Sequence, residues 1–285
     1  MTGSPRSYVV VGPTASGKSA LAMELAKKHG GEIVSVDSVQ VYRGFDIGSA
    51  KPSIKEQDDV KHHLIDIKDW HEEFDARLFA AYAKPVLQDI YKRGKVPILV
   101  GGTGLYLRAL WGGGFHQDLP KDEALRHDLA KLSNEQLKEK LASLDPKRAA
   151  QLHVNDRFRL IRALELCLLV GGGWQEKLAP QKEDRDGAYV YYLRPPRPLL
   201  HERIKIRAAK MLEDGLILEV EKLLSMGVLK DCKPMQSIGY KQACDYLSGL
   251  IPEAQLCQKI EAATRQYAKR QITWFNKVTC DEILS

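Results

Sequence analysis

The sequence of 285 residues is 44% hydrophobic and 28% charged, the balance of an ordinary folded protein that can bury a sizeable core. No stretch approaches the roughly 20 apolar residues of a membrane-spanning helix, and an apolar strand begins too close to Met1 for a signal peptide, so we expect a cytoplasmic protein. The net charge of +6 is a mild basic excess and the five cysteines show no Cys-x-x-Cys spacing, so composition indicates neither a nucleic-acid partner nor a zinc site.

The first predicted element is a buried strand at residues 8–11, followed at once by a glycine-rich turn. Residues 12–19 read Gly-Pro-Thr-Ala-Ser-Gly-Lys-Ser and fit the pattern G-x-x-x-x-G-K-[ST], and the apolar residues of 20–26 recur with helical spacing. In such a loop the backbone N–H groups and the helix N-terminus point at an anion, Lys18 adds a positive charge, and Ser19 can ligate a Mg²⁺ ion that bridges phosphates. The pattern predicts a diphosphate or polyphosphate site, but not which group is transferred.

Further strands are predicted at residues 32–36, 63–66 and 96–100, with a long helix at 76–92. Strands that alternate with helices favour a parallel sheet with right-handed crossovers. Kinases and ATP hydrolases usually carry an acidic residue after a strand to organise Mg²⁺, whereas residues 96–100 run into Gly101-Gly-Thr-Gly104. Asp37, directly after the second strand, is the best-placed carboxylate at the edge where parallel sheets bind ligands, although such an aspartate more commonly caps a turn.

The pattern changes in the middle of the chain. Residues 121–169 are strongly charged and helical, glycine clusters flank them at 112–114 and 171–173, and strand character returns at 189–193. From Pro198 onward the chain is again mostly helical. We therefore expect an α/β fold, a P-loop NTPase-like parallel-sheet core with an all-helical insertion domain. The core with its helical C-terminal part is assigned to residues 1–114 and 181–285, and the insertion to residues 115–180.

Two basic helix faces are expected in the C-terminal part. Arg203, Arg207 and Lys210 fall at i, i+4 and i+7, although spacing alone favours a solvated helix side. Residues 262–280 contain basic residues and no carboxylate, which suits a partner that carries phosphates. One face of this segment combines two aromatic residues with an arginine: Tyr267, Arg270 and Trp274. Such a face can stack bases, or it can pack into the core.

Several segments, taken in chain order, resemble the tRNA dimethylallyltransferase (tRNA isopentenyltransferase) family of bacterial type. The matching segments are residues 12–19, 34–42, 46–52, 62–66, 101–106, 145–146, 153–156, 162–165, 238–241 and 263–274. Each one except the phosphate loop is weak by itself, and the ordered set carries the resemblance. The sequence departs from the family pattern at Arg157-Phe158, where Gln-Arg is more usual, at Gly171-Gly-Gly-Trp174, where Thr-Gly-Lys-Pro is usual, and at Asn276, where arginine is frequent.

The resemblance implies an enzyme that transfers the dimethylallyl group of dimethylallyl diphosphate to the exocyclic amine of the adenine 3′ of the anticodon in tRNA, releasing diphosphate. It implies Asp37 as the general base, Thr103 as a residue that orients the amine, and Mg²⁺ as cofactor. The diphosphate-binding residues that follow are Gly12, Thr14, Ala15, Ser16, Gly17, Lys18, Ser19, Arg203 and Arg207. The tRNA-binding residues that follow are Asp37, Ser38, Val39, Gln40, Thr103, Arg126, Arg157, Phe158, Arg159, Leu160, Ile161, Gln236, Ser237, Ile238, Gly239, Tyr240, Lys241, Lys269, Arg270, Gln271 and Trp274. The expected partners are the tRNA anticodon stem-loop and the prenyl diphosphate, with the enzyme acting as a monomer.

Two other functions stay open at this point. An adenylate isopentenyltransferase of the same fold would prenylate a free nucleotide and would not need the helical insertion, and a P-loop nucleotide or metabolite kinase would transfer phosphate from ATP. His62 and His63 are too sparse to hold zinc and are expected to pack at a strand end. The cysteines are expected to be structural or incidental.

Overall fold

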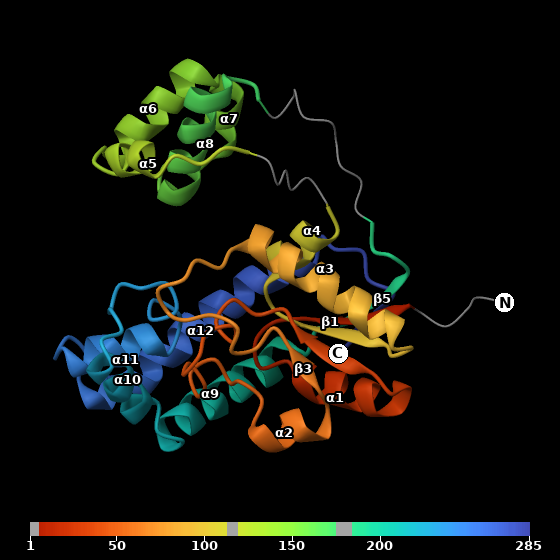
Figure 1. The fold of residues 1–285 in the computed structure, drawn as a ribbon. Coiled ribbons are helices and arrows are strands. Elements are labelled where there is room, and N and C mark those ends of the chain that lie inside the picture. The colour runs from red at the N-terminus through yellow and green to blue at the C-terminus, as the bar shows by residue number, and fades with distance from the viewer. Residues whose placement is uncertain (1–5, 113–118, 175–183) are drawn as a thin grey trace. The chain divides into compact units, whose positions relative to one another are not determined.

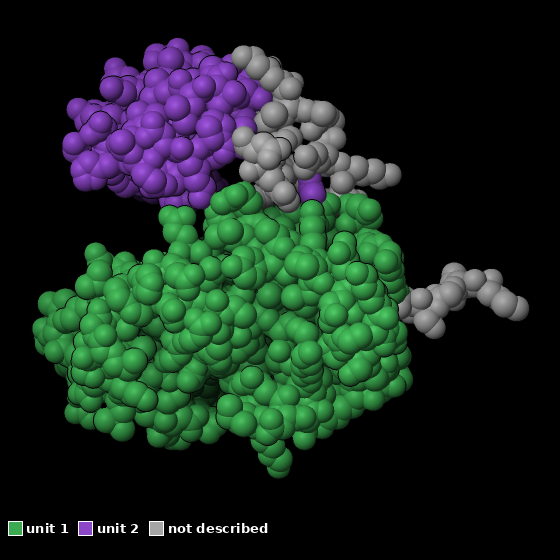
Figure 2. Space-filling view, viewed as in Figure 1, with its two compact units in different colours: residues 1–111, 184–285 green, residues 112–183 purple. Residues whose placement is uncertain are grey.

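The computed structural model describes residues 6–112, 119–174 and 184–285. The chain forms two compact units, the first made of residues 1–111 and 184–285 and the second of residues 112–183 (Figure 2). The boundaries expected from the sequence, at 114/115 and 180/181, lie outside the described residues. Within the described residues, every helix is too short or too polar to cross a membrane.

A six-stranded parallel sheet forms the centre of the first unit (Figure 1). In spatial order its strands are β3 (His62–His63), β2 (Glu32–Ser35), β4 (Pro97–Gly101), β1 (Ser7–Val11), β5 (Ala188–Leu193) and β6 (Glu282–Leu284). Every residue of β1 is buried, as expected of a central strand with helices on both faces of its sheet. Because β4 pairs with β2 on one side and with β1 on the other, the loops that follow these three strands begin at the same edge.

The sequence correctly predicts the strands at 8–11, 32–36, 96–100 and 189–193, to within a residue at each end. The strand expected at 63–66 is wrong in extent, because only His62 and His63 pair with β2. The chain then turns away through Leu64 and Asp66, whose φ angles are 62° and 54°. The sequence gives no indication of β6, whose three residues pair at the sheet edge and are mostly exposed.

Helices pack around this sheet, and the predicted helix at 76–92 is confirmed residue for residue. They are α1 (Lys18–His29), α2 (Ile54–Asp59), α3 (Ala76–Lys92), α4 (Gly104–Leu110), α9 (Arg197–Glu213), α10 (Leu216–Ser225), α11 (Tyr240–Leu247) and α12 (Glu253–Phe275). Asp75 begins α3 by accepting a 2.9 Å hydrogen bond from Leu78 N. The long helix α12 packs against α4, α9 and α11. It therefore connects the loop after β4 with the C-terminal helices.

The paired histidines have a structural role, as expected. His63 Nε2 lies 2.7 Å from a carboxylate oxygen of Glu32, whose side chain is 1% exposed and is also held by Arg93 and Lys95. Hydrogen bonds from Arg93 hold the pKa of Glu32 far below its ordinary value, against the effect of burial. The described residues contain no group of His, Cys, Asp and Glu side chains that would hold a metal ion, and the cysteines are free thiols.

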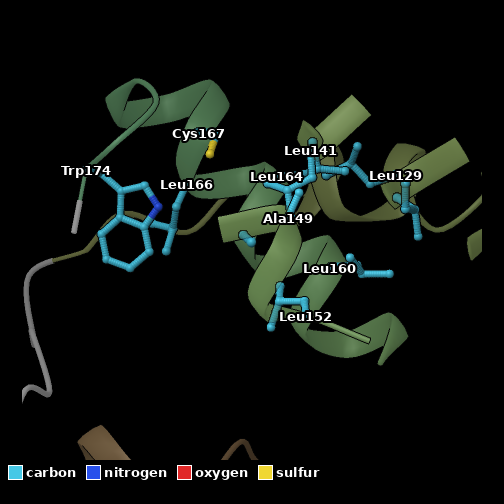
Figure 3. Close-up of a cluster of buried hydrophobic side chains, with 11 residues drawn as sticks. Leu129, Leu141, Ala149, Leu152, Leu160, Leu164, Leu166, Cys167 and Trp174 are labelled. Carbon is cyan, nitrogen blue, oxygen red and sulfur yellow. The ribbon is translucent and has the colours of Figure 1, made fainter. Parts of the chain in front are cut away.

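The second unit is a bundle of short helices with its own core (Figure 3). Its helices are α5 (Glu123–Leu129), α6 (Asn134–Leu144), α7 (Pro146–Gln151) and α8 (Arg157–Val170). The side chains of Asp122, Ser133, Asp145 and Asp156 each accept a hydrogen bond from the first turn of the helix that follows. Leucine and alanine side chains fill the core. The helical character predicted for residues 121–169 is confirmed.

Candidate active site

The phosphate loop of residues 12–19 leads from the end of β1 into α1. A side chain at Gly12 would lie 2.5 Å from the carbonyl oxygen of Leu193 in β5, so only glycine allows this close approach. Gly17 has φ of 96°, a left-handed conformation that glycine adopts without strain, and α1 begins at the next residue. The loop backbone thus curls at the N-terminus of a twelve-residue helix, a geometry that favours an anion.

Two hydroxyl groups of the loop are suited to oxygen ligands. Ser16 Oγ is buried and has no hydrogen-bond partner within the described residues. A buried hydroxyl left unpaired is costly, so a bound phosphate oxygen would stabilise it. Ser19 lies exposed in the first turn of α1. A Mg²⁺ ion bound through a diphosphate takes only one or two protein oxygens, so a single hydroxyl at this place fits that ion.

Three cations from two helices surround the loop. Lys18 Nζ donates a 2.6 Å hydrogen bond to a loop carbonyl, and Arg203 of α9 lies 3.3 Å from the carbonyl of Ser16. Burial, followed by the charge of Arg207, lowers the pKa of Lys18 to about 7, while Asp37 acts in the opposite direction. Burial also lowers the pKa of Arg207, again against Asp37. A bound diphosphate would offset the mutual repulsion of these cations.

Asp37 caps the turn that follows β2, and it does so with one oxygen. Oδ1 accepts hydrogen bonds from Val39 N at 2.8 Å and from Gln40 N at 3.2 Å. No hydrogen bond to Oδ2 comes from any residue that the structure describes. The turn therefore fixes the carboxylate in place, and its second oxygen is available to a substrate.

Thr103 lies at the same edge of the sheet as Asp37. A side chain at Gly101 would lie 2.0 Å from the carbonyl oxygen of Val36, and Thr103 N is 3.4 Å from the same oxygen. This contact holds the loop after β4 against the end of β2. Because Asp37 follows Val36 directly, the two residues that the sequence assigns to catalysis come together.

Helix α12 closes this edge through Gln271. The side-chain amide accepts a 2.8 Å hydrogen bond from Thr14 N and donates one of 3.1 Å to the carbonyl of Gly102. Gln271 is buried, with 6% of its surface exposed. Gln271 therefore joins the phosphate loop to the loop after β4, and this positioning role was not expected of a residue assigned to tRNA binding.

The two aromatic residues whose position the sequence leaves open lie half-buried at the same edge. Burial, followed by the charge of Asp37, raises the pKa of Tyr267 to about 12, with the side chains of Thr103 and Gln271 opposing the rise. The indole of Trp274 packs on Gly104, where a Cβ atom would lie 2.0 Å from Nε1. The sequence does not assign Tyr267 to the site, although it precedes Gln271 by four residues and so shares its helix face.

Buried side chains occur among the residues expected to bind tRNA. Leu160 and Tyr240 are 0% exposed, and the hydroxyl of Tyr240 bonds to Glu219 at 2.5 Å. With Gln271 they offer no side-chain surface to a partner in this structure. A match to a sequence motif identifies the residue type at a position. Whether its side chain faces solvent or the core depends on the packing around it.

In the second unit the expected residues fall into two groups. Arg157 is occupied by the carbonyls of Ala130 and Leu132 and by Asn134, so it ties helices together. Phe158 is 82% exposed. It borders a shallow hollow of about 400 Å³ whose lining residues are Glu123, Arg126, His127, Ala130, Phe158, Ile161 and Arg162.

The fully buried Glu165 orients two arginines of this hollow. It accepts a 2.9 Å hydrogen bond from Arg126 Nε and a bond from Arg162, and it also caps Asp122 N at 2.8 Å. These bonds hold the pKa of Glu165 below its ordinary value, although burial alone would raise it. The guanidinium of Arg126 is thereby fixed in place.

Comparison with known proteins identifies relatives over almost the whole chain. Residues 40–278 match the sequence model of IPP transferase. A tRNA dimethylallyltransferase of Geotalea uraniireducens is 46% identical over 280 residues, covering 94% of this chain and 88% of that protein. One from Halalkalibacterium halodurans is 43% identical over 277 residues, covering 93% of this chain and 86% of that protein.

Solved structures of related enzymes have a similar fold. The full-length tRNA isopentenylpyrophosphate transferase of Bacillus halodurans has a TM-score of 0.72 at 40% identity, covering 99% of this chain and 90% of that chain. A eukaryotic dimethylallyltransferase, solved acting on tRNA, has a TM-score of 0.77 at 28% identity, covering 95% of this chain and 70% of its own. The expected α/β fold with its parallel sheet is confirmed.

Proposed function

The chain belongs to the IPP transferase family of tRNA dimethylallyltransferases, and from this premise we propose that it transfers the dimethylallyl group of dimethylallyl diphosphate to the exocyclic amine of the adenine 3′ of the anticodon in tRNA, releasing diphosphate. The geometry supports this reaction because a cationic phosphate loop and the carboxylate of Asp37 meet at one edge of the sheet. The loop suits the leaving group, and the carboxylate suits the proton that the amine must lose.

The first requirement of the reaction is to stabilise the leaving group. The bond between the allylic carbon and a diphosphate oxygen breaks, and its electron pair leaves with the diphosphate. Lys18, Arg203 and Arg207, with the loop amides and Ser16 Oγ, would stabilise the charge that develops there. Ser19 Oγ would hold a Mg²⁺ ion, which would supply further charge neutralisation for the leaving group.

The second requirement is to remove a proton from a weakly nucleophilic amine. As the bond from the adenine nitrogen to the allylic carbon forms, Oδ2 of Asp37 would accept the proton, since Oδ1 is held by the turn. Thr103 would orient the amine by hydrogen bonding. Tyr267, with its pKa near 12, stays protonated at neutral pH and so serves as a neutral hydrogen-bonding group.

The acceptor adenine must leave the stack of the anticodon loop before it can reach this edge, which costs a few kcal/mol. Exposed residues of the expected tRNA-binding set would offset that cost through phosphate and stacking contacts: Phe158, Arg159, Gln236, Lys241, Lys269 and Arg270. A tRNA substrate is also consistent with a cytoplasmic enzyme.

The test is incubation of the protein with dimethylallyl diphosphate, Mg²⁺ and unmodified tRNA, followed by mass analysis of the nucleosides. We expect a five-carbon addition to one adenosine. Parallel incubations with AMP, ADP and ATP as acceptors should show no product. Modification of free nucleotides with none on tRNA would contradict the proposal, as would transfer of phosphate from ATP.

A further inference from the structure

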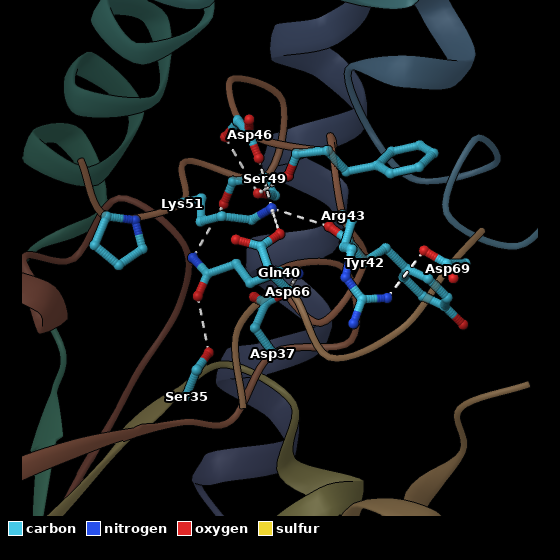
Figure 4. A network of polar contacts seen from close by, with 12 residues as sticks. Ser35, Asp37, Gln40, Tyr42, Arg43, Asp46, Ser49, Lys51, Asp66 and Asp69 are labelled. Carbon is cyan, nitrogen blue, oxygen red and sulfur yellow. Dashed lines mark hydrogen bonds and ion pairs between the residues drawn. The ribbon is translucent and has the colours of Figure 1, made fainter. Parts of the chain in front are cut away.

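The buried ammonium of Lys51 joins separate parts of residues 42–66, a segment that follows Asp37 in the chain (Figure 4). Its side chain is 4% exposed, and its three N–H groups are directed at three oxygens. Lys51 Nζ lies 2.9 Å from the carbonyl oxygen of Tyr42, 2.5 Å from Asp46 Oδ1 and 2.6 Å from Asp66 Oδ1. A lysine buried in this way holds its partners in place, because an ammonium removed from water needs an acceptor for each of its three N–H groups.

The segment that Lys51 fixes is connected to Asp37 through Gln40. The side-chain NH₂ group of Gln40 donates to the carbonyls of Ser49, at 3.3 Å, and Ala50, at 3.1 Å, directly before Lys51. Its side-chain oxygen accepts a 2.8 Å hydrogen bond from Ser35 Oγ in β2. Its backbone N–H donates to Asp37 Oδ1. Asp66, which binds the ammonium of Lys51, also donates its backbone N–H to the carbonyl of Gln40 at 3.2 Å. Hydrogen bonds therefore connect the buried ammonium to the carboxylate of Asp37 through Asp66 and Gln40.

The backbone around Lys51 is strained, which indicates that its contacts enforce its shape. Ala50 and Asp66 have φ of 48° and 54°, in the left-handed region that residues with a side chain disfavour. Such positions cost about 1 kcal/mol or more and persist where surrounding contacts determine them. A second anchor holds the same segment: Glu219 of α10 accepts hydrogen bonds from the amides of Asp46 and Ile47, at 3.2 and 2.8 Å.

We propose that Lys51 is a positioning residue for the transfer reaction: it fixes residues 42–51, and through Gln40 it holds the turn that orients Asp37. Lys51 lies outside the phosphate loop and does not touch the substrate in this role. Its loss should therefore affect the rate of transfer and leave binding of the prenyl diphosphate intact. This inference rests on the function proposed above.

The test is the steady-state kinetics of Lys51→Met, which keeps most of the length of the side chain and removes its charge. We expect kcat to fall about 10- to 100-fold, the loss typical of a small displacement of a reacting group, with KM for dimethylallyl diphosphate changed less than about threefold. Asp66→Asn, a milder change, should reduce kcat in the same direction. It keeps the test valid if Lys51→Met does not fold.

Two controls separate positioning from general destabilisation. Lys27→Met removes an exposed lysine that pairs with Asp59, and Ile90→Val weakens the core by about 1 kcal/mol; both should retain the wild-type kcat below their melting temperatures. The double variant of Gln40→Ala and Lys51→Met should lose less activity than the product of the single losses, because both act through one connection.

Each outcome has a distinct meaning. A wild-type protein without prenyl transfer would refute the proposed function itself. An active wild type with an unchanged kcat in folded Lys51→Met, or with independent effects in the double variant, would refute the positioning role alone. A fall in kcat for Ile90→Val as large as that for Lys51→Met would also refute the positioning role.

Discussion

At the level of single residues, Asp37 shows how one side chain can satisfy a structural requirement and still be available for the proposed chemical one. An aspartate after a strand most often caps a turn, and Asp37 does so through Oδ1. The cap is compatible with the proposed role as base, because it holds the carboxylate through Oδ1 and makes no use of Oδ2. The same two amide bonds also help to fix the direction in which the base points.

The proposed base can be separated from the cap by two substitutions. Asp37→Asn keeps an oxygen that the amides of Val39 and Gln40 can reach, but it cannot accept a proton at neutral pH. Asp37→Ala removes both functions. We expect kcat to fall about 10²- to 10⁴-fold in each, with near-normal tRNA affinity in a filter-binding assay. Full activity of Asp37→Asn would remove the residue from the role of base.

Lys18 gives the site a dependence on pH. Its pKa in the free protein is about 7, against 10.5 for an ordinary lysine, so above pH 7 the folded protein has lost a proton that the unfolded chain keeps. The charged form is disfavoured in the fold, and this destabilising contribution decreases as the pH rises from 7 toward 10.5. A bound diphosphate favours the charged form and so raises the pKa.

Binding of a prenyl diphosphate at pH 8 should therefore take up about one proton through Lys18, and the affinity should fall as the pH rises above 7. Calorimetry with a non-reactive thiodiphosphate in buffers of different ionisation enthalpy measures this uptake. Lys28→Met, which removes an exposed lysine of the same helix, should leave it unchanged. Binding at pH 8 without proton uptake would show that Lys18 is already charged in the free protein.

At the level of elements, α12 shows what a sequence pattern can and cannot establish. Apolar runs and caps are local signals, so the strands at the centre of the sheet and the helix at 76–92 are predictable from them. Helical spacing also places Tyr267, Arg270 and Trp274 on one face of α12. It cannot show that Gln271 is buried against the phosphate loop, because this contact joins residues 257 positions apart.

The same limit applies to Lys51. Its contacts depend on left-handed turns at Ala50 and Asp66. Alanine gives no indication of such a conformation, and aspartate, although enriched there, adopts it only in a minority of cases. The catalytic assignments come from the resemblance, and the structure brings Asp37 and Thr103 together at one edge. The sequence likewise does not show that the side chains of Leu160 and Tyr240 face the core, because this depends on how the helices pack.

The exposed end of α12 is expected to contact the tRNA backbone. Arg270 is exposed, with its guanidinium 5.7 Å from the centroid of the Tyr267 ring. Arg270→Ala should weaken tRNA binding and reduce the slope of log K against log salt concentration by about one, since one phosphate contact is lost. Lys259→Ala, an exposed change earlier in the same helix, is the matched control. An unchanged slope for Arg270→Ala would mean that this arginine does not touch a phosphate.

At the level of the whole molecule, the proposed reaction assigns different requirements to the two units. The first unit contains the sheet, the phosphate loop, Asp37 and α12. The second is a helical bundle with its own core and with Phe158 exposed beside two arginines. The second unit is inserted between Trp111 and Asp184, which are joined by a 2.9 Å backbone hydrogen bond. The insertion thus leaves and re-enters the first unit at neighbouring points.

This geometry allows the insertion to be removed without stretching the first unit. Replacing residues 113–183 with a short glycine linker keeps β1, β4 and β5, because these strands pair with one another and not with the second unit. We expect the shortened protein to fold and to bind the thiodiphosphate analogue within about threefold of the full chain, since the contacts to a small ligand lie in the first unit. Transfer to tRNA should fall by at least about 100-fold, because the phosphate and stacking contacts of the second unit are lost. Retention of full activity on tRNA would show that the first unit alone recognises its acceptor, and loss of analogue binding in a folded protein would show that the phosphate loop depends on the insertion.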